Sequence, residues 1–150
     1  MGPADGLPAA ALGKSRLYRY ADPLGALNLA VMTGGDELWW HFDQTDFVVS
    51  IALQDAAAGG DFEYVPMIRA PGDERYDDVG AVLRGADGDG VVHVPMDPGT
   101  LMLFEGRHSV DRVTPVEGEE ARLVALLAYD TKPGTMSSEL LNLVRYGRGA

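Results

Sequence analysis

The sequence predicts an all-β fold with two minor helices, arranged as a single domain. Three observations support this prediction. Short apolar runs are separated by turn residues at intervals of about 8 to 12 positions, which is typical of all-β proteins. The 150 residues include 19 glycines and 9 prolines, a content that favours turns over long helices. Hydrophobic residues make up 46% and charged residues 23% of the chain, which excludes intrinsic disorder.

Nine segments have the apolar and β-branched composition that is typical of strands. They are Leu17–Tyr20, Ala26–Met32, Leu38–Phe42, Phe47–Leu53, Asp61–Val65, Val91–Val94, Thr100–Phe104, Ser109–Val113 and Ala121–Tyr129. Residues that favour turns separate these segments at Gly34–Asp36, Gly59–Gly60, Asp87–Gly90, Asp97–Gly99 and Glu117–Gly118. We therefore expect strands joined mostly by tight turns.

Two segments depart from the strand pattern and predict helices. Within residues 73–84, acidic residues come first and apolar residues follow at helical spacing, at Tyr76, Val79, Val82 and Leu83. Within residues 135–146, Ser137 or Ser138 is a suitable N-cap before Leu140, Leu141 and Val144. We expect a short helix near residues 73–85 and a C-terminal helix near residues 135–147.

The chain organisation predicted from sequence is a flexible N-terminal tail over residues 1–15 and a single domain over residues 16–150. No cysteine is present, so disulfides and thiolate metal sites are excluded. A net charge of −11 argues against binding to nucleic acids or to anionic membranes. No segment reads as a transmembrane helix or a secretory signal, and we expect a cytoplasmic protein.

Two features of the sequence point to a binding site. His41 and Asp43 are two residues apart, so on a strand their side chains share one face. They could hold a divalent metal together, or form a plain hydrogen-bonded pair. Arg122 begins a long apolar strand, where a buried guanidinium needs an anionic partner. That partner is either an internal carboxylate or the carboxylate of a bound ligand.

Several longer stretches carry a resemblance to a known family. They are Trp40–Asp43, Gly59–Tyr64, Gly99–Leu101, Arg112–Gly118, Arg122–Leu123, Lys132–Gly134 and Tyr146–Arg148. From about Tyr20 to Arg148 the sequence resembles the ArpA-like group of bacterial iron(II)- and 2-oxoglutarate-dependent dioxygenases, which are relatives of the amino-acid hydroxylases and halogenases. The resemblance implies a double-stranded β-helix, a cupin-like jelly-roll barrel with a metal in its mouth.

The same resemblance assigns roles to individual residues. His41 and Asp43 match the His-x-Asp pair of the family's metal triad, with an acid at the second position as in hydroxylases. Arg122 matches the arginine that holds the far carboxylate of 2-oxoglutarate, and Asn28 is placed to contact this cosubstrate. The implied cofactors are Fe(II), or another divalent metal, and 2-oxoglutarate. The implied reaction is hydroxylation or desaturation of a small molecule, such as an amino acid or a biosynthetic intermediate.

One position departs from the family pattern. Asp111 stands where the resemblance places the distal histidine of the triad, which gives a variant His41, Asp43 and Asp111 site. His108, three residues earlier, would replace it as third ligand only if the chain were bulged. A second carboxylate lowers the charge of the metal centre and therefore weakens the binding of a dianionic cosubstrate.

Three functions are compatible with this variant site. The first is an active metal-dependent oxygenase. The second uses the same barrel for redox-neutral acid–base chemistry, as an isomerase, cyclase or lyase, with His41 and the aspartates as acid and base. The third is a non-catalytic homologue that binds a ligand or a partner.

Other expectations concern the surroundings of the site. Trp40, Arg107 and Glu63 are candidates for the substrate pocket. Members of the resembling family usually carry a sizeable N-terminal region that packs against the barrel, whereas about fifteen residues precede the first predicted strand here. We therefore expect exposed apolar surface that a second copy, as a homodimer, or a partner subunit covers.

Overall fold

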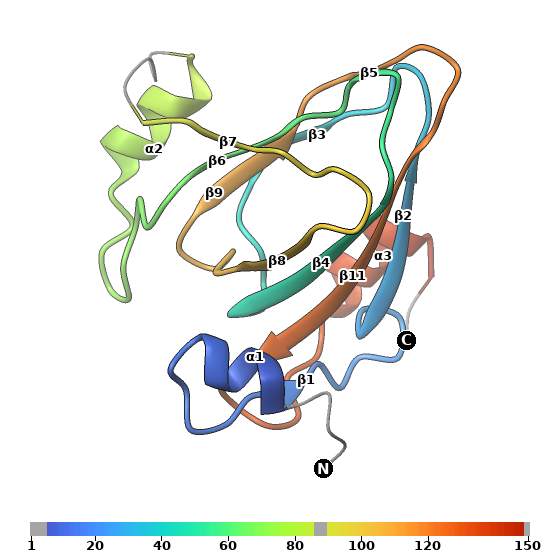
Figure 1. The fold of residues 1–150 in the computed structure, drawn as a ribbon. Coiled ribbons are helices and arrows are strands. Elements are labelled where there is room, and N and C mark those ends of the chain that lie inside the picture. Colours follow the sequence, from blue (N-terminus) through green and yellow to red (C-terminus); the bar gives the residue numbers. More distant parts are fainter. Residues whose placement is uncertain (1–5, 86–89, 149–150) are drawn as a thin grey trace.

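Two antiparallel sheets form most of the molecule (Figure 1). The computed structural model describes residues 6–85 and 90–148. One sheet contains five strands, β1 (Tyr18–Arg19), β2 (Leu27–Met32), β4 (Phe47–Gln54), β8 (Leu101–Phe104) and β11 (Arg122–Asp130). The other contains four, β3 (Leu38–His41), β6 (Phe62–Val65), β7 (Val92–Val94) and β9 (Val110–Val113). A small third ladder joins β5 (Ala58–Gly59) to β10 (Val116–Glu117).

The long strand β11 organises the larger sheet because it pairs on both sides, with β4 along one edge and with β2 and β1 along the other. Side chains alternate between the two faces of each strand, so one face of this sheet turns toward the smaller sheet. Phe62 and Phe104 meet edge to face between the sheets, with ring centroids 5.2 Å apart. The arrangement is a double-stranded β-helix, as predicted.

All nine predicted strands are present in the structure, and each differs from its expected range by one residue at one or both ends. The predicted turns fall between them, although residues 87–89 of the turn at Asp87–Gly90 lie outside the described part of the chain. The short strands β5 and β10 were not predicted. Their pairing is set by the positive backbone angle of Gly59 (φ 63°), not by any apolar run.

The two predicted helices are confirmed as α2 (Tyr76–Leu83) and α3 (Glu139–Tyr146). The Ser138 side chain caps α3 by accepting a hydrogen bond from the Leu141 backbone at 3.2 Å. Gly147 ends the helix with the left-handed backbone conformation that favours glycine (φ 68°). No helix of residues 6–85 and 90–148 has the length and hydropathy that are needed to cross a membrane.

The N-terminal segment differs from the flexible tail that the sequence predicted. Residues Gly6–Ala11 form a short helix, α1, and Ala9 is buried against the larger sheet together with Phe47, Val49 and Tyr129. The outer face of β4 and β11 is apolar at this point, and burying it stabilises a helix that is too short to be stable alone. Residues 1–5 of the expected tail lie outside the described part of the chain.

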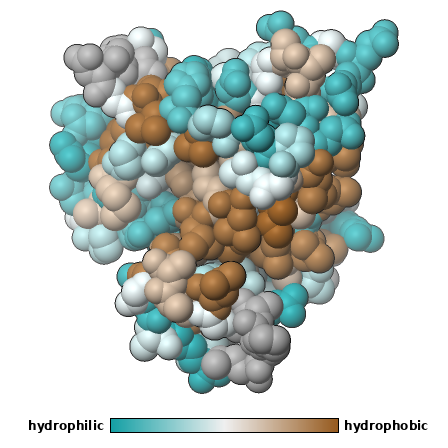
Figure 2. All heavy atoms as spheres, viewed as in Figure 1, coloured by the Kyte–Doolittle hydropathy of each residue, from teal (hydrophilic) through white to brown (hydrophobic). Residues whose placement is uncertain are grey.

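Beyond α1, the outer face of the larger sheet is exposed. Leu27, Leu29 and Val31 alternate along β2 with the residues that face the barrel interior, and each is more than half exposed. Leu53 on β4 and Leu101 on β8 are also half exposed. Figure 2 shows this surface as a continuous hydrophobic area above α1. A sheet that is apolar on both faces is typical of one that is covered on both sides.

Candidate metal centre and cavity

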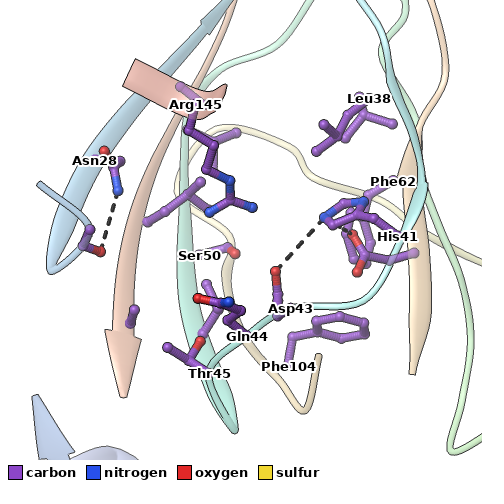
Figure 3. A pocket seen from close by; sticks show the side chains of 18 of the residues that line it. Asn28, Leu38, His41, Asp43, Gln44, Thr45, Ser50, Phe62, Phe104 and Arg145 are labelled. Atoms are coloured by element: carbon purple, nitrogen blue, oxygen red, sulfur yellow. Dashed lines mark hydrogen bonds and ion pairs between the residues drawn. The ribbon is translucent and has the colours of Figure 1, made fainter. Parts of the chain in front are cut away.

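A cavity of about 140 Å³ lies between the two sheets, and α3 borders its mouth (Figure 3). Its walls are largely apolar, and its polar lining comes from strands of both sheets, from adjoining loops and from α3. The polar and charged residues that line it are Tyr20, Asn28, His41, Asp43, Gln44, Thr45, Ser50, Asp111, Arg122, Ser137 and Arg145. One water needs about 10 to 15 Å³ of such space, so the cavity has room for a small molecule.

Three potential metal ligands converge in this cavity. His41 ends β3, Asp43 follows two residues later, and Asp111 lies directly opposite His41 in the pairing of β3 with β9. His41 Nε2 is 3.8 Å from an Asp43 carboxylate oxygen and 3.7 Å from an Asp111 carboxylate oxygen. One ligand atom from each residue lies within 4.8 Å of the other two. The side chains expected to form the triad are therefore brought together.

The orientation of the His41 ring is fixed by the backbone. Nδ1 lies 2.9 Å from the carbonyl oxygen of Trp39. A carbonyl can only accept a hydrogen bond, so Nδ1 carries a proton in this contact, and Nε2 is the ring nitrogen that faces the two carboxylates. Such a contact on the far nitrogen is typical of histidines that bind metals.

The two carboxyl groups are held at an electrostatic cost. Burial, together with the negative charge of Asp43, raises the pKa of Asp111 to about 8. Burial also raises the pKa of Asp43, although His41 opposes this effect. One Asp111 oxygen, Oδ2, is buried and has no hydrogen-bond partner in the described part of the chain. A bound cation would relieve this cost, because it stabilises both ionised carboxylates.

Arg122 contributes a buried guanidinium to the lining of the cavity. The residue is 5% exposed, and within residues 6–85 and 90–148 its buried Nε has no hydrogen-bond partner. Burial lowers the pKa of its guanidinium, while Asp55 and Asp61 act in the opposite direction. Asn28 also lines the cavity, where its side-chain oxygen accepts a hydrogen bond from Tyr146 Oη at 3.1 Å. Both residues therefore line the same cavity as His41, Asp43 and Asp111.

Two of the expected pocket residues lie on the opposite face of their strands. Trp40 precedes His41 on β3, so its side chain points to the opposite face of the strand. There it packs beside Val110, and the Arg112 guanidinium lies 4.6 Å from the centroid of its ring. Glu63 is 5% exposed but is paired with Arg112 and with His93, whose Nε2 lies 2.9 Å away. Neither residue lines the cavity. The inward positions are taken by His41 on β3 and by Phe62 on β6.

Arg107 and His108 likewise lie away from the three ligands. The Arg107 guanidinium forms ion pairs with Asp46 and with Asp130, the second at 3.1 Å. His108 Nδ1 lies 3.3 Å from the Glu105 carboxylate. Both residues line a separate surface groove, because the turn that follows β8 directs their side chains outward. The expected place of Arg107 in the substrate pocket is therefore corrected, and the structure does not bring His108 to the metal ligands.

Sequence reasoning missed two contributors to the cavity. Arg145 reaches it from α3, on the same helix face as Leu141, one turn earlier. The i, i+4 spacing of these two residues was the available signal. Gly106 leaves space for Asp43, since a β-carbon at position 106 would lie 2.0 Å from a carboxylate oxygen of Asp43. No local sequence pattern indicates this long-range contact.

Comparisons with known proteins identify similarity of fold. No family model matches the sequence, and no curated protein is found as a relative. AviO1 from Streptomyces viridochromogenes superimposes with a TM-score of 0.65 and 22% identity over 90% of this chain and 60% of its own. The carbocyclase SnoK from nogalamycin biosynthesis, described as non-haem and alpha-ketoglutarate-dependent, gives 0.57 and 18% over 83% and 57%.

A third solved structure extends this result. An oxidoreductase of the 2OG-Fe(II) oxygenase family from Burkholderia pseudomallei gives a TM-score of 0.53 and 18% identity over 73% of this chain and 45% of its own. This chain therefore spans 45% to 60% of the length of the three structures. Identities this low establish the architecture alone. The chain has the same double-stranded β-helix fold as these three structures.

Proposed function

We propose that this protein is a metal- and 2-oxoglutarate-dependent oxygenase of the ArpA-like type, acting on a small molecule by hydroxylation or desaturation. One observation carries the proposal: His41, Asp43 and Asp111 converge in a cavity that also contains the buried guanidinium of Arg122. A metal chelate at one end and a cation at the other suit a keto-dicarboxylic acid. The same function is supported by the likeness of fold to the oxidoreductase of the 2OG-Fe(II) oxygenase family and to the alpha-ketoglutarate-dependent carbocyclase.

The three ligand residues fit a divalent metal ion. One imidazole and two carboxylates are a donor set for Fe(II) or Mn(II), and the free Oδ2 of Asp111 is a further oxygen donor. His41 would bind through Nε2, because Nδ1 is already hydrogen-bonded to the Trp39 carbonyl oxygen. When bound, such a metal supplies the activation of molecular oxygen. His41, Asp43 and Asp111 would hold it at the wall of the cavity.

The remaining residues position the organic ligands. Arg122 would bind the far carboxylate of 2-oxoglutarate, because its Nε is buried and no other group in the described part of the chain satisfies it. Asn28 borders the same cavity and is held by Tyr146. The apolar walls, which include Phe62, Phe104 and Met102, exclude water from the reacting centre.

An anaerobic titration tests this function. Ferrous ion and then 2-oxoglutarate are added to the purified protein while the visible charge-transfer band of the metal–keto-acid chelate is recorded. We expect a saturable band in the native protein and none in His41→Ala. A band that is absent under saturating conditions contradicts the oxygenase function and favours redox-neutral chemistry or a non-catalytic role in the same cavity.

A further inference from the structure

Arg145 is a second guanidinium at the cavity. It projects from α3 toward the side of Asp43 in Figure 3, and it borders the same space as Arg122. Within residues 6–85 and 90–148 it forms no ion pair, whereas Arg69, Arg107 and Arg112 each have a carboxylate partner. A positive charge without a partner at the mouth of an apolar cavity is available to an anionic ligand.

The helix that carries Arg145 is fixed to the barrel. Asn142 donates a hydrogen bond to Asp22 at 2.8 Å, and the Ser137 backbone donates to the same carboxylate at 3.2 Å. At the other end of α3, Tyr146 donates to Asn28 at 3.1 Å. Asp22 is fully buried, so these contacts are shielded from water. Arg145 is therefore presented from a supported element and not from a free terminus.

The formal charges in the cavity show what Arg145 contributes. A divalent metal bound by two carboxylates, Asp43 and Asp111, is close to neutral. The keto-dicarboxylic acid then brings two negative charges, and Arg122 balances one of them. The second negative charge would remain uncompensated inside an apolar cavity, which is strongly unfavourable. This count rests on the proposed function.

We propose that Arg145 supplies the second positive charge of the cosubstrate site. A metal centre with two carboxylates can then bind a dianionic cosubstrate, because Arg145 compensates the negative charge that Arg122 leaves unbalanced. Arg145 lines the cavity together with Asp43, Asp111 and Arg122, so its charge faces the same space that the cosubstrate would occupy. Arg145 is therefore a determinant of cosubstrate binding that acts through charge at the mouth of the cavity.

Binding measurements on Arg145→Met test this inference. Mn(II) affinity is measured by calorimetry, and 2-oxoglutarate affinity is then measured on the metal-loaded protein without oxygen. We expect 2-oxoglutarate to bind about threefold to tenfold more weakly, because Arg145 is exposed and water screens part of its charge. Metal should bind as tightly as before or more tightly, because a repelling cation has been removed. Arg148→Met, at an exposed arginine outside the cavity, should change neither affinity.

A double-mutant cycle tests the dependence on Asp111. In Asp111→His the metal centre regains a positive charge, so adding Arg145→Met should weaken 2-oxoglutarate binding much less than in the native background. An equal loss in both backgrounds overturns the inference. Should Asp111→His fail to bind metal, 2-oxobutyrate replaces 2-oxoglutarate on the single variant. Because this probe lacks the second carboxylate, its affinity should fall less than that of 2-oxoglutarate, and an equal fall overturns the inference.

Two failures are distinguishable in this design. If native protein binds neither metal nor 2-oxoglutarate, the proposed function fails, and this inference fails with it. If native protein binds both and Arg145→Met behaves as Arg148→Met does, the proposed function stands and the role of Arg145 is overturned.

Discussion

Gly106 and Asp43 are in such close contact that position 106 has no room for a side chain. A β-carbon there would lie 2.0 Å from an Asp43 carboxylate oxygen and 2.7 Å from its Cβ. The Asp43 backbone also donates a hydrogen bond to the Gly106 carbonyl at 3.0 Å. Asp43 lies beyond the last residue of β3, so this contact with the turn after β8 holds it in place.

Gly106→Ala should therefore displace Asp43 from the metal centre. We expect metal affinity to fall by about tenfold or more, as when a group that orients a ligand is lost. The overpacked turn should also cost roughly 1 to 3 kcal/mol of unfolding free energy. Calorimetry with Mn(II) and urea unfolding measure the two effects. Gly90→Ala is a suitable control, because a β-carbon there meets nothing closer than 3.8 Å. Equal metal affinity in both variants would contradict the role of Gly106.

Asp111 should make the metal-free protein less stable. Its Oδ2 is buried without a partner in the described part of the chain, and Asp43 is a neighbouring like charge. Folding raises the pKa of Asp111 to about 8, so at neutral pH folding has the cost of protonating this carboxylate or of burying its charge, and asparagine avoids that cost. Asp111→Asn should therefore raise the unfolding free energy of the metal-free protein by roughly 1 to 3 kcal/mol, while weakening metal binding. Thermal unfolding in chelator and metal titration measure the two effects.

Asp130→Asn provides the contrast for this prediction. Asp130 is equally buried but is paired with Arg107, so its loss should lower stability. If Asp111→Asn lowers stability as much as Asp130→Asn does, the Asp111 carboxylate makes a stabilising interaction in the folded protein and the prediction is wrong.

Much of the fold could be predicted because its signals are local. Turn residues and apolar runs placed the ends of the nine predicted strands within one residue, and Ser138 was one of two candidates for the N-cap of α3. The helix α1 was missed because six residues have too few turns to show a period. It forms because Ala9 packs on an apolar sheet face, which is a tertiary effect.

The candidate site was predictable where spacing along one strand decides it. The pair His41 and Asp43 followed from alternation. Glu63 was placed in the pocket because alternation does not say which face of a strand points inward, and in the structure Phe62 takes that position. The opposition of His41 and Asp111 depends on the register of β3 against β9, which no local pattern specifies. Arg145 was missed for a similar reason, since its role depends on where α3 docks.

Asp46 should make stability depend on pH in the acid range. Burial acts to raise the pKa of its carboxyl, but hydrogen bonds from Thr131 and Arg107 outweigh this and hold the pKa well below its usual range. The unfolded value is about 3.9. Because the folded pKa is depressed, the stabilisation is fully present above the unfolded pKa and is lost as the pH falls toward the folded pKa.

Urea unfolding at several pH values measures this effect. At pH 7 we expect Asp46→Asn to cost roughly 1.5 to 3 kcal/mol, as for hydrogen bonds to a charged group. The difference from native protein should shrink steadily below about pH 4. Asp78→Asn, at a surface pair with Arg75, should have little effect at any pH. A pH-independent cost at position 46 would mean that packing, not charge, explains it.

The exposed outer face of the larger sheet should mediate self-association. Leu27, Leu29 and Val31 form an apolar surface on a chain whose net charge is −11. Because these side chains carry no charge, two copies can bring this surface together without direct repulsion, and a two-fold pairing buries it on both. We therefore expect a homodimer in light scattering at micromolar concentration. Leu29→Glu should weaken it by about 2 kcal/mol or more, whereas Leu83→Glu, an exposed leucine on α2, should not. A monomeric native protein under these conditions would contradict self-association through this face.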